Sequence, residues 1–313
     1  MNHILTVVTS ARGADAMLAH TRSMASVIGA KITLLRLLNP VTDRSRSTRI
    51  VDPLDWHIRK LEVEATLGQM ADTLRESGAD VTTAVLEGAD AEVLCQYAET
   101  SGVDLMLLAK EPENIGDLIH PVMKRTTLPV AILPVDEAWF GVDNPDRYQK
   151  VLVPLDGSQR AEVILPVVTA LAQDHNPKFL LTHVVTRPEM PRHAPPSPEE
   201  TELVDRLVGI NRAEAARYLE SFAARVPGDV ETRLLVSDNV AAALHQLIEQ
   251  ESIDLIILSA HGYSGRPQWP YGSVAGNLIT YCSKPVLVVQ DLPAISSSAS
   301  GSMPVARMFR RAR

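Results

Sequence analysis

Short apolar runs alternate with longer amphipathic stretches along most of this 313-residue chain. The apolar runs are almost continuous in Val, Ile and Leu, which is typical of strands covered on both faces in a parallel sheet. The stretches between them carry apolar residues at helical spacing, so the pattern predicts an α/β fold built from βα units. Strands are expected near residues 3–9, 31–38, 80–86, 103–109, 129–135, 150–155, 178–185, 230–236, 253–259 and 285–290. Helices are expected over 14–29, 52–78, 90–102, 158–174 and 274–281.

The same pattern occurs twice. "GVDLMLLA" at 102–109 matches "SIDLIILS" at 252–259, and "KITLLRLL" at 31–38 matches "KFLLTHVV" at 178–185. The order of the matches is kept and their offset drifts slowly, which indicates a tandem duplication with insertions in loops. We therefore expect a first domain at 1–135, a linker at 136–149, a second domain at 150–291 and a disordered tail at 292–313. The proline-rich stretch 187–200 is expected to be an extended loop.

Composition narrows the class of protein. With 45% hydrophobic and 22% charged residues the chain is expected to be globular, and a net charge of −8 argues against a general nucleic-acid binder. We expect no membrane span, because no apolar run approaches about 18 residues. The start, "MNHILTVVTS", lacks the apolar core of a signal peptide, so a cytoplasmic location is expected. Cys95 and Cys282 form no CxxC pair and indicate neither a disulfide framework nor a zinc site.

Candidate chemistry gathers in residues 259–274, "SAHGYSGRPQWPYGSV", between an apolar run and a helical stretch. Ligands of open parallel sheets bind beyond the carboxyl ends of the strands. Glycines let backbone N–H groups approach a phosphate, and the start of the next helix adds its dipole. Asp156 follows the first strand of the second copy. Its carboxylate would accept hydrogen bonds from a ribose or base, or would cap a helix from residue 158; both readings stay open.

These residues resemble the universal stress protein family, many of whose members carry G-x2-G-x9-G-(S/T) after the fourth strand. Here Ser259 stands at the first glycine, Gly262 follows, and Gly272 and Ser273 come after nine intervening residues. The runs "VLVPLDGS" at 151–158 and "KPVLVV" at 284–289 match the family's first and last strands. The resemblance covers nearly the whole chain twice. It implies two Rossmann-like domains, each with a five-stranded parallel sheet of order 3-2-1-4-5, related by a pseudo-twofold axis.

The resemblance also implies binding of ATP or AMP, with or without Mg²⁺, in the second domain. The glycine loop would meet the phosphates and ribose, and the first two strands would meet the adenosine. The nucleotide-binding residues implied are Pro154, Asp156, Val184, Ser259, Gly262, Gly272, Ser273 and Val274. No catalytic residue and no metal ligand of the protein is expected.

The first copy is expected to be structural. Thr9 stands where the second copy has Asp156, and the loop 109–122 is shorter than its counterpart. Gly116 and Asp117 align with Gly272 and Ser273. A carboxylate at that place would repel a phosphate, and Glu111 and Glu113 add to the repulsion.

Two functions remain open at this point. One is a stress-response protein whose second domain binds an adenine nucleotide, acting as a nucleotide-responsive regulator or scaffold. The alternative is a structural interaction protein with both clefts degenerate, which Ser259 and Asp238 favour, Asp238 being aligned with Gly88 of the first copy. An enzyme is not expected, beyond very slow ATP hydrolysis. The chain shows no Walker A lysine, HExxH or nucleophile elbow, and His261 is interpreted as a structural or surface group.

Partners beyond a nucleotide follow only from the strand pattern. The fifth strand of each copy lies at a sheet edge in the family order, and "LPVAILPV" (128–135) and "KPVLVV" (284–289) are apolar, with no charge beyond the initial Lys284. Such edges favour pairing with another strand. We expect residues 130–133 to run antiparallel to 286–289, which makes the chain an intramolecular pseudo-dimer and leaves other faces for a homodimer. A protein partner is expected but its identity is not indicated.

Overall fold

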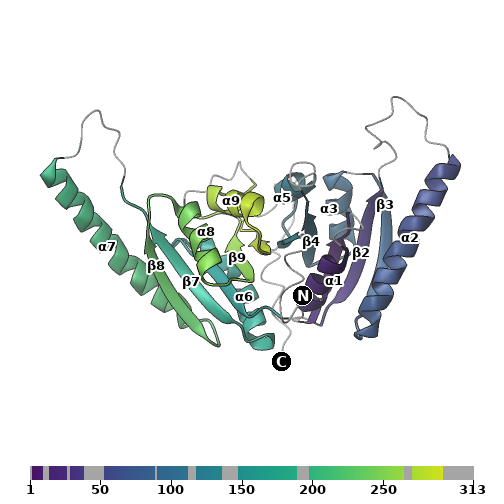
Figure 1. The fold of residues 1–313 in the computed structure, drawn as a ribbon, viewed down its shortest axis with the longest axis horizontal. Helices are drawn as coiled ribbons and strands as arrows, with labels where there is room; N and C mark the ends of the chain where they lie inside the picture. The colour runs from purple at the N-terminus through teal and green to yellow at the C-terminus, as the bar shows by residue number, and fades with distance from the viewer. Residues whose placement is uncertain are drawn as a thin grey trace. The chain divides into compact units, whose positions relative to one another are not determined.

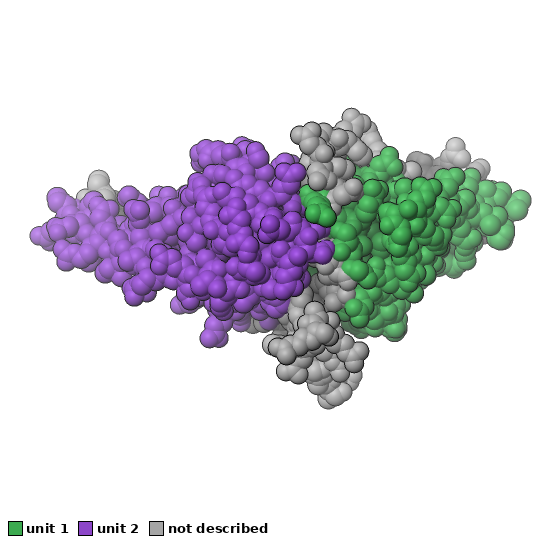
Figure 2. Space-filling view, turned by 90° about the horizontal axis from the view of Figure 1, so that it is seen from below, with its two compact units in different colours: residues 1–147, 267–270, 292–313 green, residues 148–266, 271–291 purple. Residues whose placement is uncertain are grey.

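The computed structural model describes residues 2–9, 14–26, 29–38, 53–88, 90–111, 118–135, 147–188, 197–263 and 270–291. The chain divides into two compact units, of which the first contains residues up to Arg147 and the second contains Tyr148–Arg266 and Tyr271–Asp291 (Figure 2). The expected linker up to residue 146, the tail from 292 and most of the proline-rich stretch lie outside the described residues.

Unit 1 is a parallel five-stranded sheet with helices between its strands (Figure 1). The strands lie in the order β3-β2-β1-β4-β5. They are β1 (His3–Val7), β2 (Lys31–Leu38), β3 (Val81–Glu87), β4 (Leu105–Lys110) and β5 (Val130–Pro134). The helices are α1 (Ala14–Ser26), α2 (Pro53–Glu76), α3 (Ala91–Thr100) and α5 (His120–Arg125).

Unit 2 repeats this plan with the strand order β8-β7-β6-β9-β10. Its strands are β6 (Lys150–Pro154), β7 (Lys178–Val185), β8 (Val230–Val236), β9 (Leu255–Ser259) and β10 (Val286–Val289). The helices are the 3-10 helix η3 (Ala161–Ile164), α6 (Leu165–Asp174), α7 (Pro198–Ala223), α8 (Val240–Gln250) and α9 (Ser273–Tyr281). Each unit therefore has the order 3-2-1-4-5 that the resemblance implied.

Fully buried strands hold the core of each unit. Every residue of β5, β9 and β10 is buried, as the continuous apolar runs predict for strands covered on both faces. Burial of one such Val, Leu or Ile side chain stabilises a fold by about 1.5–3 kcal/mol. These strands are therefore rigid supports for the loops that leave their carboxyl ends.

Matching backbone hydrogen bonds show which positions of the two units correspond. The N–H of Val8 donates to the carbonyl of Leu35 at 2.8 Å, and the N–H of Leu155 donates to the carbonyl of Thr182 at 2.8 Å. The residue after Leu155 is Asp156, and the equivalent position 9 of unit 1 is a threonine, as the sequence match predicts.

The same comparison corrects the alignment of Asp238. The N–H of Gly88 donates to the carbonyl of Leu38 at 2.8 Å, and the N–H of Ser237 donates to the carbonyl of Val185 at 3.1 Å. Gly88 therefore corresponds to Ser237, and the sequence-based pairing with Asp238 is wrong by one residue. The offset between the copies is 149 residues here, as it is between the helix N-caps Asp90 and Asn239, whereas the pairing with Asp238 uses the offset of 150 found at 102–109.

Two expected boundaries are also wrong because local capping decides them. Helix α7 begins at Pro198 rather than after residue 200, because Ser197 and Glu200 form a capping box. The Ser197 hydroxyl accepts the Glu200 N–H at 3.2 Å, and the Glu200 carboxylate accepts the Ser197 N–H at 2.7 Å. The helix expected from residue 158 instead begins as η3 at Ala161, whose N–H donates to the Ser158 hydroxyl at 3.1 Å.

Two further expectations concern strand pairing between the units and helices that span a membrane. The pairing of β5 with β10 is a relation between the units and stays a prediction. Within the described ranges, none of the helices is both long and apolar enough to cross a membrane.

Candidate functional site

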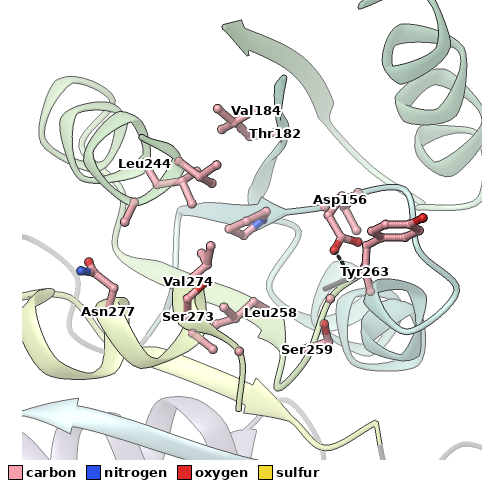
Figure 3. Close-up of a pocket in the computed structure, with 18 of the residues that line it drawn as sticks. Asp156, Thr182, Val184, Leu244, Leu258, Ser259, Tyr263, Ser273, Val274 and Asn277 are labelled. Atoms are coloured by element: carbon pink, nitrogen blue, oxygen red, sulfur yellow. Dashed lines mark hydrogen bonds between the residues drawn. The ribbon is translucent and has the colours of Figure 1, made fainter. Parts of the chain in front are cut away.

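Unit 2 contains a cavity of about 550 Å³ beyond the carboxyl ends of β6, β7 and β9 (Figure 3). Small-molecule sites commonly have volumes of about 300–1,000 Å³. This edge is where open parallel sheets bind their ligands. All eight residues expected from the sequence line this one cavity: Pro154, Asp156, Val184, Ser259, Gly262, Gly272, Ser273 and Val274.

Several lining residues were not identified from the sequence. The loop before α8 and the first turns of that helix form one wall, and β7, Tyr263 and α9 add further contacts. The signal for the α8 wall was present, because Asn239 stands directly before a helical apolar run, as N-cap residues do. The lining residues that the sequence did not indicate include Thr182, Asn239, Leu244, Leu258, Tyr263 and Asn277.

Asp156 holds the glycine loop through its carboxylate. Oδ2 accepts the N–H of Tyr263 at 2.5 Å, and Oδ1 accepts the N–H of Ser158 at 3.0 Å. A Cβ atom on Gly262 would lie 2.0 Å from Oδ2, so the loop approaches Asp156 this closely only with glycine there. The capping interpretation of Asp156 is wrong for η3, whose N-cap is Arg160. Each carboxylate oxygen keeps a lone pair with which it can accept a ligand's hydrogen bond.

Ser259 fits the turn in which the family pattern has glycine. Its hydroxyl donates to the carbonyl of His261 at 2.6 Å, and the residue is buried. Among the described residues other than glycine, positive φ occurs at Asn176 and Ser252, so Ser259 requires no left-handed backbone. The serine therefore does not distort the loop.

His261 is buried beneath the loop and does not line the cavity. Its Nδ1 lies 2.7 Å from Oδ1 of Asp291, and its backbone N–H donates to the same oxygen at 3.1 Å. The Nε of Arg160 lies 3.7 Å from the other carboxylate oxygen. Because the Asp291 side chain is completely buried, these contacts fix the loop to the short segment that follows β10. His261 is thus a structural group, as interpreted from the sequence.

The start of α9 forms the polar floor of the cavity. Gly272 is its N-cap and supplies no side-chain cap, so the first N–H groups of the helix are left for a ligand or solvent. The carbonyl of Ala260 accepts the Gly272 N–H at 2.7 Å, which places the helix start against the end of β9. A Cβ on Gly272 would approach its nearest neighbour at only 3.7 Å, so glycine is not sterically required there. Backbone N–H groups and the helix dipole favour an anion at this end.

The remaining walls are apolar, with isolated polar groups. Val184, Leu244 and Leu258 lie on different sides of the cavity (Figure 3). The hydroxyl of Thr182 is buried and has no hydrogen-bond partner among the described residues. Oδ1 of Asn277 accepts a 2.8 Å hydrogen bond from Nε2 of His245, which holds the Asn277 amide at the cavity edge. Such a cavity suits a flat, mostly apolar group attached to a polar one.

The charge of the lining is negative. Asp156 and Asp238 contribute carboxylates, and the described lining residues contain no Lys, Arg or His side chain. Burial lowers the pKa of His183, the residue after Thr182 on β7, while the nearby Asp156 charge and a hydrogen bond from the imidazole to the backbone of Leu155 oppose that shift. Within the described residues no group of three or more His, Cys, Asp or Glu is arranged to hold a metal ion.

Unit 1 differs at the equivalent places. Leu35 stands where unit 2 has Thr182, and Thr9 stands where it has Asp156. The expected repulsive residues Glu113 and Asp117, with Gly116, lie outside the described residues, so that part of the expectation stays a prediction.

Comparisons with known proteins find the same family in both halves of the chain. The model of the Universal stress protein family matches residues 1–134 and 147–290. Universal stress protein MJ0577 of Methanocaldococcus jannaschii is 28% identical over 159 residues, which cover 46% of this chain and 95% of that protein. Universal stress protein Rv2005c of Mycobacterium tuberculosis is 26% identical over 184 residues, which cover 56% of each chain.

Among solved structures, a functionally unknown protein from Pseudomonas aeruginosa has a TM-score of 0.66 at 14% identity. The match covers 93% of this chain and 92% of that one. A universal stress protein from Archaeoglobus fulgidus has a TM-score of 0.58 at 13% identity, covering 91% and 96%. These likenesses show the fold, and the family model shows the membership: the chain belongs to the universal stress protein family and carries its domain twice in tandem.

Proposed function

We propose that unit 2 binds an adenine nucleotide, ATP or AMP, and that the chain acts as a nucleotide-responsive regulator or scaffold in a stress response. The observation that carries the proposal is that the eight residues named from the family resemblance, in three separate segments, line one cavity of about 550 Å³. Residues chosen from a chance pattern would not gather around one space at the ligand-binding edge of the sheet.

The cavity offers a place for each part of a nucleotide. A phosphate would accept hydrogen bonds from the N–H groups at the start of α9 and from the Ser273 hydroxyl. The adenine would lie among the apolar side chains Val184 and Leu244. A ribose hydroxyl would donate to a free lone pair of the Asp156 carboxylate. Where Mg²⁺ accompanies ATP, the phosphates would supply most of its ligands, as is usual for this ion.

We propose further that the protein binds its nucleotide without turning it over at enzymatic rates. The described lining carries no lysine and no histidine, and His261, which lies within the glycine loop, is held in its hydrogen bond with Asp291. Phosphoryl transfer relies on cations and a base placed around the phosphate. Phosphate release at about 10 per second would contradict this part of the proposal.

A second candidate function is that of an interaction protein with no nucleotide in either unit. The negative lining favours it, since Asp156 and Asp238 face a cavity that would receive a phosphate. The two candidates differ in what the purified protein carries.

Mass spectrometry of small molecules released from the purified, denatured full chain separates the candidates. The proposal predicts an adenine nucleotide at no more than one equivalent per chain, because it places the site in unit 2 and gives unit 1 a structural role. An empty preparation that also fails to bind millimolar AMP and ATP in a calorimetric titration would favour the interaction protein. Two equivalents per chain would contradict the structural role of unit 1.

A further inference from the structure

We infer that Asp238 makes this cavity selective for adenine ligands of low negative charge, so that a nucleotide with one phosphate binds better than ATP. The inference rests on the proposed nucleotide function and names the class of ligand within it. Its basis is the distribution of charge at the two helix ends that face the cavity.

Asp238 is an unpaired carboxylate on the cavity wall. It lines the cavity and is exposed, and its side chain forms no hydrogen bond or ion pair with any described residue. The Asp156 carboxylate, by contrast, accepts hydrogen bonds from two backbone N–H groups, those of Ser158 and Tyr263. With no cationic side chain among the described lining residues, the charge of Asp238 is left to act on whatever occupies the cavity.

Two helices begin at this cavity, and their ends differ. The N–H of Ala242, in the first turn of α8, is taken by the Asn239 side chain at 3.0 Å, and Asp238 stands one residue before that cap. The end of α8 is thus capped and negative. Helix α9 begins at Gly272 without a side-chain cap, so its N–H groups are open. The cavity therefore has one end that attracts an anion and one that repels it.

A ligand that matches this arrangement is a nucleoside with a single phosphate. Its phosphate would lie at the start of α9, and its uncharged sugar and base would face the α8 end. The β- and γ-phosphates of ATP would add charge to a cavity that already holds two carboxylates, unless a divalent cation neutralised them. The free energy of binding should therefore worsen with each added phosphate when Mg²⁺ is absent.

The duplication supplies a matched substitution. Because Ser237 corresponds to Gly88, Asp238 corresponds to position 89, which is alanine in the sequence of the first copy. Asp238→Ala thus introduces the residue of the sister domain and leaves the cap Asn239 in place. Asp238→Asn is the second variant, since it removes the charge and keeps the size.

Calorimetric titration of the full chain tests the inference with adenosine, AMP and ATP, each with and without Mg²⁺. For the wild type without Mg²⁺ we expect AMP to bind at least about tenfold more tightly than ATP, as one close like charge would cause near a protein surface. Asp238→Ala and Asp238→Asn should both tighten ATP binding severalfold and leave adenosine binding unchanged. Added salt should narrow the gap between AMP and ATP.

Three results would overturn the inference. Equal affinity of the wild type for AMP and ATP without Mg²⁺ is one, and an ATP-to-AMP ratio unchanged in both variants is another. The third is an adenosine affinity that rises as much as that for ATP, because the effect would then be steric. If no adenine ligand binds any form of the chain, the proposed function itself fails, and this selectivity fails with it.

Discussion

The backbone N–H of Tyr263 donates a 2.5 Å hydrogen bond to Oδ2 of Asp156, which joins the glycine loop to the end of β6. The same oxygen lies 2.0 Å from the point where a Cβ on Gly262 would be. The Asp156 carboxylate therefore occupies the space that a side chain at position 262 would need. Changing either residue changes the space available to the other.

Gly262→Ala should destabilise unit 2 by about 1–3 kcal/mol, the usual cost of forcing a group into filled space. Asp156→Ala removes the obstructing oxygen, so the double variant should be more stable than the sum of the single changes predicts, by about 1 kcal/mol or more. Denaturant unfolding of the three variants gives these free energies. Gly272→Ala is the control, because its Cβ would meet no atom closer than 3.7 Å. A Gly262→Ala variant as mild as that control would contradict the account.

His261→Ala should also destabilise unit 2 and loosen the loop. The substitution leaves the buried Asp291 carboxylate without the partner at 2.7 Å, and hydrogen bonds to charged groups contribute about 1.5–3 kcal/mol. Hydrogen exchange should quicken at the N–H of Tyr263. His261→Asn, whose amide can still donate, should recover part of the stability. Unfolding free energies equal to that of the wild type in both variants would show that this contact does not hold the loop.

His20 should make the stability of unit 1 depend on pH. The residue is fully buried, and burial lowers its pKa from 6.5 to about 3. Below pH 6.5 the unfolded chain binds a proton that the folded chain excludes, so stability is greatest above that pH and falls as the pH falls towards 3. The slope approaches about 1.4 kcal/mol per pH unit.

Denaturant unfolding at several pH values between 7 and 4 checks this expectation against His20→Gln, which cannot titrate there. The wild type should lose stability more steeply than the variant as the pH falls, because the other groups are common to both. Parallel curves for the two proteins would show that the folded state accepts the proton at this site.

Cys95 should resist alkylation in the folded protein. Burial, with help from the charges of Glu99 and Asp90 and against that of Arg125, raises its thiol pKa to about 11. The thiolate, which is the reactive form, is then scarce at pH 8. Peptide mapping after iodoacetamide treatment should find Cys95 unmodified in the native chain and modified in guanidinium chloride. Rapid modification without denaturant would mean that α3 opens readily.

The strands follow from the sequence because burial on both faces gives nearly continuous apolar runs, and the strand order follows from the resemblance to the family. The run 255–259 is apolar up to its last residue and is a fully buried strand. Where the expectation was wrong, one local hydrogen bond decided the outcome. The capping box of Ser197 and Glu200 starts α7 within a proline-rich stretch, and the Ser158 hydroxyl receives the first N–H of η3.

The cavity is predictable only in the parts that loops and strand ends contribute. Gly262 and Gly272 stand out in the sequence because glycine has a recognisable role beside an anion. Leu244 and Asn277 line the cavity because α8 and α9 each turn one face toward it. Which face a helix turns toward a cavity depends on how the helix packs. Tyr263 contributes its backbone N–H while its side chain is exposed, so its residue type carries no signal.

The central claim is that the cavity of unit 2 binds an adenine nucleotide with its phosphate at the start of α9. Calorimetric titration of AMP into Gly272→Asp and Gly272→Asn tests it most directly. Asp and Asn are both good N-cap residues and both fit beside a nearest neighbour at 3.7 Å, so each variant should fold. The account predicts that Gly272→Asp abolishes AMP binding, because its carboxylate takes the phosphate position, while Gly272→Asn keeps measurable affinity. Equal AMP affinity in the wild type and Gly272→Asp, or none in the wild type, would contradict it.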